Sequence, residues 1–124
     1  MIDGKIILLL DDDVAHLAEV SRYLEGLYCR ALRCRTVAAA EQALADAPDF
    51  AIVDLFLDGD AGAELSNDFI RGSLLPRHIP YGRMSSAPSL IPADLRGDWV
   101  LHKRLFWDNP ETLLPLLLQS LTPE

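Results

Sequence analysis

Apolar and polar stretches alternate along the chain and divide it into strand and helix signals. Residues 5–10 (KIILLL), 49–54 (DFAIVD) and 99–103 (WVLHK) are short and mostly apolar. Such runs are typical of strands in a parallel sheet, because helices cover both of its faces. Residues 28–36 are rich in arginine and weakly patterned, which favours an edge strand. Residues 79–87 are a poorer candidate, and with them the pattern predicts five strands.

Helical signals lie between these strands. In residues 14–27 apolar side chains recur three and four positions apart, and Asp13 precedes them as an N-cap. Thr36 predicts the cap of a second, alanine-rich helix, and a short third helix is expected over residues 63–72. Asn109 predicts the start of a final helix that runs to residue 121. Strands that alternate with helices predict a doubly wound α/β sheet with helices on both faces.

Prolines are expected to disturb two of the helices. Pro88 and Pro92 fall where a fourth helix should connect the last two strands. This helix is therefore expected to be short or irregular. Pro115 lies inside the final helical pattern and is expected to kink that helix.

The final helix carries more leucine than one buried stripe needs. We expect the core-facing stripe to consist of Leu114, Leu117, Leu118 and Leu121. Leu113 and Leu116 are then surplus, and exposed apolar surface of this kind predicts a hydrophobic partner or a homodimer face.

Composition argues against several classes of protein. The 124 residues are enough for one domain, residues 1–124, with its own core. A net charge of −8, from 19 acidic and 11 basic residues, argues against nucleic acid as a partner. No run approaches the roughly 20 apolar residues of a membrane span, and no secretory signal is visible, so a cytoplasmic protein without membrane contact is expected. Cys29 and Cys34 are five positions apart and should lie on opposite faces of a strand, as reduced thiols.

Three carboxylates follow strands that should be neighbours. Asp11 and Asp12 come directly after the first strand, and Asp54 ends the third. In doubly wound sheets a binding site forms beyond the carboxyl ends of the strands, so these acids are expected to converge. Hard oxygen ligands of this kind suit Mg²⁺. The alternative is that the first acids only begin a helix, where its dipole favours negative charge.

The chain resembles the receiver domains of response regulators in two-component signalling over its whole length. "ILLLDDD" is similar to the family's acidic pocket, and "PDFAIVDLFLDGDAGAEL" to the segment around its phosphoacceptor, which would be Asp54. "IPYGRMSSA" places the family's switch hydroxyl at Ser85, with Ser86 as the alternative. "WVLHK" ends on Lys103, at the family's lysine. The resemblance implies a flavodoxin-like sheet with the strand order 2-1-3-4-5.

The resemblance also implies a chemistry. Asp54 would accept a phosphoryl group from a histidine kinase or a histidine phosphotransfer protein, and the domain would then bind a downstream protein target. Mg²⁺ would be held by Asp12, Asp54 and the backbone carbonyl of Phe56, with Asp11 acting mostly through water. Lys103 would pair with a phosphoryl oxygen.

Ser85 would donate a hydrogen bond to another phosphoryl oxygen and move with it. Phe56 and Ala87 flank the path of the hydrolytic water in this family, and neither side chain can orient water. Slow self-dephosphorylation is therefore expected.

Some residues depart from the family pattern. Arg104 stands where a proline usually follows the lysine, which puts the reach of Lys103 in question. Gly82 and Arg83 fall in an internal strand, where glycine packs poorly and arginine needs a partner.

Two other readings remain open. A degenerate receiver could serve as a phosphorylation-independent interaction or oligomerisation module. "ILLLDDDVA" also resembles the nucleophile motif of haloacid-dehalogenase-like Mg²⁺-dependent phosphatases, with Asp11 as nucleophile and Asp13 as acid. Ala15 replaces that motif's usual hydroxyl residue.

Overall fold

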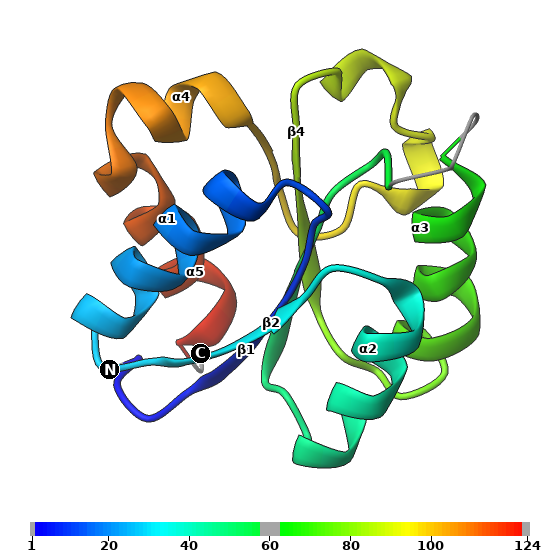
Figure 1. Cartoon of the computed structure of the whole chain (residues 1–124), viewed down its shortest axis with the longest axis horizontal. Helices are drawn as coiled ribbons and strands as arrows, with labels where there is room; N and C mark the ends of the chain where they lie inside the picture. The colour runs from blue at the N-terminus through cyan, green and yellow to red at the C-terminus, as the bar shows by residue number, and fades with distance from the viewer. Residues whose placement is uncertain (1, 58–62, 123–124) are drawn as a thin grey trace.

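Five parallel strands form the centre of the computed structural model, which describes residues 2–57 and 63–122 (Figure 1). Their order across the sheet is β2-β1-β3-β4-β5, which confirms the expected doubly wound topology and places the arginine-rich strand at one edge. The strands are β1 (Ile6–Leu10), β2 (Arg30–Cys34), β3 (Phe50–Val53), β4 (Tyr81–Ser85) and β5 (Val100–His102).

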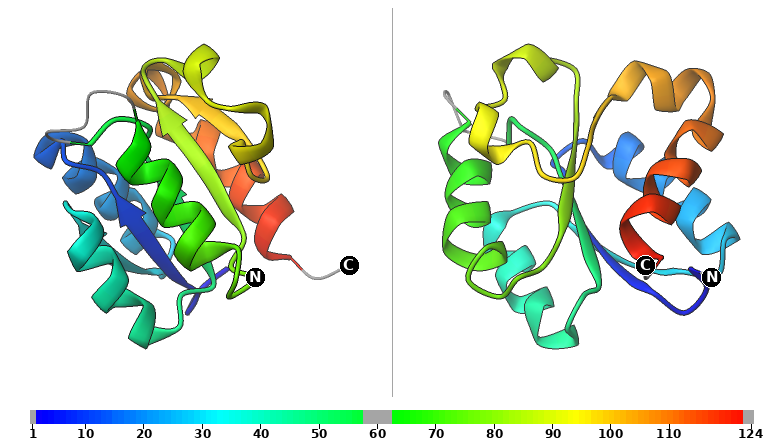
Figure 2. Two further views of the ribbon diagram at one scale, coloured as in Figure 1. Left: turned by 90° about the vertical axis from the view of Figure 1, so that its right-hand side faces the viewer. Right: turned by 180° about the vertical axis from the view of Figure 1, so that it is seen from behind.

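Helices cover both faces of this sheet, as Figures 1 and 2 show. One face carries α1 (Val14–Gly26), α4 (Lys103–Asp108) and α5 (Leu113–Leu121). The other carries α2 (Val37–Ala43) and α3 (Glu64–Phe69), which continue into the 3-10 turn η1 (Leu44–Asp46) and the π-helical turn η2 (Ile70–Leu74). Within the described residues, no helix combines the length and the apolar character needed to cross a bilayer.

Successive residues along a strand point to opposite faces of the sheet and pack into two different hydrophobic cores, one on each face. Ile7 and Leu9 of β1 belong to the core under α1 and α5, whereas Leu8 and Leu10 belong to the core under α2 and α3. This follows from the two-residue period of a strand. Cys29 and Cys34 fall into different cores and both are free thiols, as expected.

Two of the three predicted helix caps are confirmed. The Asp13 carboxylate accepts hydrogen bonds from the backbone N–H groups of Ala15 and His16 at the start of α1. Thr36 Oγ1 accepts one at the start of α2. Asn109 caps a short 3-10 turn, η5 (Pro110–Thr112), rather than α5 itself.

The connection between β4 and β5 is irregular, as its prolines predict. Two 3-10 turns, η3 (Pro88–Leu90) and η4 (Ala93–Leu95), stand in place of a full helix. The helix α4 comes after β5 and was not predicted from the sequence. It starts at Lys103 itself, and its cap is His102, whose Nδ1 accepts the N–H of Arg104 at 3.0 Å. A proline at position 104 would lack this donor.

The predicted leucine stripe of the last helix is partly wrong. The buried residues of α5 are Leu113, Leu117 and Leu121, while Leu114 and Leu118 are half-buried at the edge of the core. Because η5 precedes it, α5 is shorter than expected and Pro115 lies in its first turn, where backbone N–H groups have no intrahelical acceptor. Leu113, expected to be surplus, is instead fully buried, and Leu116 is half-buried against the same core; the homodimer face itself remains a prediction.

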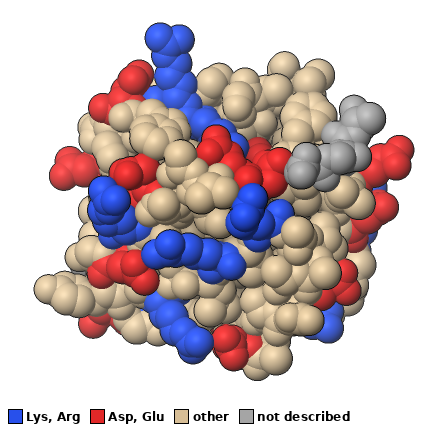
Figure 3. All heavy atoms as spheres, in the orientation of Figure 1, with Lys and Arg blue, Asp and Glu red and all other residues tan. Residues whose placement is uncertain are grey.

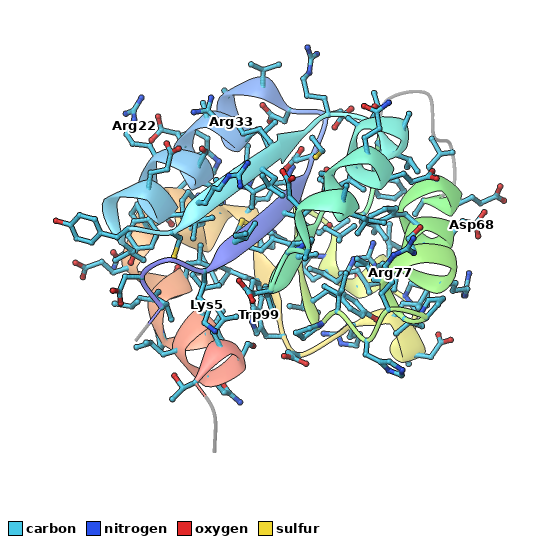
Figure 4. The ribbon with its side chains drawn as sticks, turned by 90° about the horizontal axis from the view of Figure 1, so that it is seen from below. Lys5, Arg22, Arg33, Asp68, Arg77 and Trp99 are labelled. Atoms are coloured by element: carbon cyan, nitrogen blue, oxygen red, sulfur yellow. The ribbon has the colours of Figure 1, made fainter. Side chains whose placement is uncertain are left out.

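Charges of both signs mingle over α1 and β2 (Figure 3). Arg22 pairs with Glu19, and Arg33 pairs with Glu25 and donates to Ser21. Figure 4 shows Arg22 and Arg33 along this side of the molecule. Because Glu19 and Glu25 pair with Arg22 and Arg33, these two arginines do not form a strongly basic patch.

Gly82 allows an aromatic ring to lie against β4. A Cβ at this position would lie 2.6 Å from the indole ring of Trp99, which stacks on Phe50 with a centroid separation of 5.6 Å. The glycine that looked unsuitable for a strand is therefore what gives Trp99 its place in the core.

We expect Gly82→Ala to destabilise the fold by about 1 to 3 kcal/mol, because the added methyl group must displace the stacked indole. Urea denaturation followed by tryptophan fluorescence measures the change. Gly26→Ala is the control, since a Cβ there meets nothing within 4 Å and a helical alanine should leave stability unchanged or slightly higher. Equal stability of wild type and Gly82→Ala would contradict this account of the packing.

Candidate functional site

The three predicted carboxylates converge at the carboxyl end of the sheet. One carboxylate oxygen from each of Asp11, Asp12 and Asp54 lies within 4.8 Å of the others. The cause is strand register: Leu10 pairs with Val53, so the residues that follow them leave adjacent strands side by side. The N–H of Asp54 donates to the carbonyl of Leu10 at 2.9 Å and fixes this junction. Figure 3 shows acidic side chains gathered near the end of β1.

Lys103 reaches this pocket and joins two of the acids. Its Nζ lies 3.0 Å from Asp11 Oδ2 and 3.2 Å from Asp54 Oδ2. The side chain is 13% exposed and both carboxylates are 8% exposed, so these ion pairs are largely shielded from water. The loss of the usual proline after the lysine therefore does not prevent the contact.

The pocket contains more negative than positive charge, because the single ammonium group of Lys103 faces the carboxylates of Asp11 and Asp54. Burial, together with the charge of Asp11, raises the pKa of Asp54 to about 7, although Lys103 and the N–H of Leu55 lower it. Burial also lowers the pKa of Lys103, but Asp54 and Asp11 more than offset this, and its pKa lies above the ordinary value. One ammonium group thus compensates two buried carboxylates only in part.

The donor set fits a hard divalent cation. The carboxylates of Asp11, Asp12 and Asp54 offer oxygen ligands. Asp12 is only half-buried, so a cation from solvent can reach these three carboxylates. Mg²⁺ typically takes one or two carboxylates and keeps several waters. Asp11, Asp12 and Asp54 are therefore the residues that would hold it, and the carbonyl of Phe56 as a further ligand stays a prediction.

The two serines differ in their environment. Ser85 ends β4 and is 1% exposed, whereas Ser86 is exposed. The Ser85 hydroxyl accepts the N–H of Ala87 at 2.9 Å. Its position at the carboxyl end of the strand beside β3 suits the predicted hydroxyl role, which stays a prediction.

His16 lies at the edge of the pocket, a position that sequence reasoning missed. Its Nε2 is 3.0 Å from Met84 Sδ and 3.9 Å from Asp11 Oδ2, and its ring contacts Phe106 and Trp107 of α4. Burial is the main cause that lowers its pKa, so the imidazole is neutral at pH 7. Its Nδ1 has no hydrogen-bond partner in the part of the chain that the structure describes.

Arg83 is the second residue whose place the sequence did not reveal. It is fully buried in β4, on the face covered by α3, and it hydrogen-bonds to the backbone around Asp54. The signal in the sequence was the arginine itself, since an unpaired charge is not tolerated inside a sheet.

Asp13 turns away from the chemistry that the phosphatase motif would require. Its carboxylate caps α1, and it is exposed. It is thus engaged with backbone N–H groups rather than free to act as an acid beside Asp11.

No protein-family model matches the chain, and no curated protein matches its sequence. Solved structures do match. The PhyR receiver domain of Erythrobacter litoralis is 16% identical, with 99% of this chain and 97% of that chain covered and a TM-score of 0.77. A CheY-like receiver domain from Methanospirillum hungatei is 21% identical over 96% and 94%, with a TM-score of 0.76.

The anti-anti-sigma factor PhyR of Bartonella quintana is 17% identical, with a TM-score of 0.77; the match covers 95% of this chain and 47% of that one. The chain thus spans about half of that protein. Identities this low show the fold alone, and this chain has the fold of response-regulator receiver domains.

Asp54→Asn should make the protein more stable at pH 8 than the wild type. Because the pKa of Asp54 rises from 3.8 to about 7 on folding, the folded form binds more protons than the unfolded form between these pH values, and stability falls as pH rises through them. Removing the charge should recover up to about 4 kcal/mol at pH 8 and little near pH 4.

Urea denaturation at several pH values, without Mg²⁺, measures this difference. Asp68→Asn is the control, because Asp68 points outward from α3 (Figure 4) and its side chain is 77% exposed. A variant less stable than the wild type at pH 8 would show that the ion pair with Lys103 contributes more to stability than burial of the Asp54 charge and its repulsion by Asp11 cost.

Proposed function

We propose that this chain is a phosphorylation-dependent receiver domain. Asp54 accepts a phosphoryl group from a histidine kinase or a histidine phosphotransfer protein, and the domain then signals by binding a downstream protein. The observation that carries the proposal is the bridge from Lys103 to both Asp11 and Asp54 in a shielded pocket at the carboxyl ends of the strands. The receiver fold supports the same function.

In the transfer step a carboxylate oxygen of Asp54 bonds to phosphorus while the bond from phosphorus to the partner's imidazole nitrogen breaks. The nitrogen keeps the electron pair, and because the other ring nitrogen of the phosphohistidine carries a proton, the partner's histidine leaves as neutral imidazole. Asp11, Asp12 and Asp54 would hold Mg²⁺, and Lys103 would exchange its contact with Asp54 for one with a phosphoryl oxygen. Mg²⁺ bound by these carboxylates would supply positive charge for the transferred oxygens.

Ser85 would link phosphorylation to the surface. Its hydroxyl accepts the N–H of Ala87, which immediately precedes η3, and can donate its own O–H to a phosphoryl oxygen at the same time, so a movement of Ser85 toward that oxygen would pull on Ala87. The change would reach the irregular connection between β4 and β5, where Leu90 is 61% exposed. Together with exposed Leu105 and Trp107 on α4, this region offers apolar surface to a protein partner.

Incubation with Mg²⁺ and acetyl phosphate should add one phosphoryl group, visible in the intact mass. Asp54→Asn should abolish the addition completely, and Asp68→Asn should leave it unchanged. Omission of Mg²⁺ should slow the addition strongly, because the pocket then lacks charge for the incoming oxygens. A wild-type protein that is never modified, by this donor or by a phosphorylated histidine phosphotransfer protein, would instead favour an interaction module independent of phosphorylation.

Phe56→Asn should shorten the life of the phosphorylated state by roughly tenfold or more, because an amide can orient the attacking water and a phenyl ring cannot. Phe56 is 37% exposed beside the pocket, so the change should cost little stability. Decay is followed by intact mass after the donor is removed. Leu105→Asn is the control for an exposed apolar residue elsewhere, and an unchanged lifetime in Phe56→Asn would refute the explanation.

A further inference from the structure

The guanidinium of Arg83 lies directly behind the Asp54 pocket. The residue is 0% exposed and its side chain extends from β4 toward α3. It donates five hydrogen bonds to described residues, and all five acceptors are neutral. They are the carbonyls of Val53, Asp54 and Leu95, the amide oxygen of Asn67 and the hydroxyl of Ser66.

These bonds fix three carbonyls in succession where the chain leaves β3. Arg83 Nε donates to Val53 O at 3.2 Å, and Arg83 Nη2 donates to Asp54 O at 3.3 Å. The same Nη2 donates to Ser66 Oγ at 3.1 Å, and that hydroxyl donates to Leu55 O. The next carbonyl along the chain is that of Phe56, the expected backbone ligand for Mg²⁺.

Arg83 also controls the direction of the Asp54 carboxylate through one peptide group. The peptide between Asp54 and Leu55 has its carbonyl held by Arg83, and its N–H donates to Asp54 Oδ1 at 2.8 Å. Because a peptide group is planar, fixing the carbonyl fixes the direction of the N–H. The other carboxylate oxygen, Oδ2, is then free to face Lys103.

The remaining bonds tie in two further segments. Nη1 donates to Asn67 Oδ1 at 3.1 Å, in the first turn of α3, and to Leu95 O at 3.0 Å, in η4. Burial lowers the pKa of Arg83 to about 10, so the group stays charged at neutral pH. Lysine has three donors on one atom and lacks this planar fork, so it cannot reproduce the set.

We propose that Arg83 is a positioning residue of the Asp54 pocket, which holds the backbone from Val53 to Leu55, and hence the Asp54 carboxylate and the Phe56 carbonyl, in the geometry that binds Mg²⁺. Its effect on the metal rests on the proposed function. Its effect on the backbone at Leu55 does not.

The test compares Arg83→Met with Leu74→Ala, a fully buried residue of the same core that does not touch the site. Both variants should lose stability, and they are compared at temperatures equally far below their melting midpoints. An NMR titration with MgCl₂ should show about 10- to 100-fold weaker binding in Arg83→Met and wild-type affinity in Leu74→Ala, as expected for a residue behind the metal ligands. Arg83→Lys should not restore the affinity.

Hydrogen exchange of the Leu55 N–H is measured on the same samples without metal. Faster exchange than in Leu74→Ala supports the positioning role, and equal exchange in the two variants overturns it. Equal Mg²⁺ affinity in all variants also overturns the proposal. If the wild type binds no Mg²⁺, the metal part of the proposed function fails, while the Leu55 exchange still decides the role of Arg83.

Discussion

The shared ion pair of Lys103 with Asp11 and Asp54 is the interaction on which the pocket depends. Two largely buried carboxylates repel each other, and one ammonium group between them reduces that cost without removing it. The pocket is therefore held in a state that a further cation, or a proton on Asp54, would relieve. A buried arrangement that lacks positive charge is suited to binding a metal ion, whose charge the proposed phosphoryl transfer would then use.

Positive charge reaches the pocket from two directions. Lys103 approaches from the solvent side on α4, and Arg83 lies beneath, bound to the backbone and to the side chains of α3. Lysine compensates the carboxylates as a point charge, whereas arginine organises carbonyls through its planar fork. The two cations therefore have separate tasks, charge balance for one and backbone geometry for the other.

The sequence was sufficient for the sheet and for the convergence of the acids. Both follow from local patterns, since apolar runs mark the strands and the residue after each strand falls at one edge of a parallel sheet. It was not sufficient for α4, whose cap is the imidazole of His102, an unusual capping group. Nor could it give the partners of Arg83, which lie 12 to 30 positions away and meet only in the folded chain.

The direct start of α4 at Lys103 has a mechanical consequence. Phe106 of the same short helix is buried in the core, and Trp107 beside it is half exposed and touches His16. The backbone of Lys103 cannot shift without turning this helix, so a displacement larger than side-chain rotation must move the indole as well. The pocket and the indole of Trp107 are thereby linked through the six residues of α4, and a displacement of the Lys103 backbone would change the surroundings of that indole.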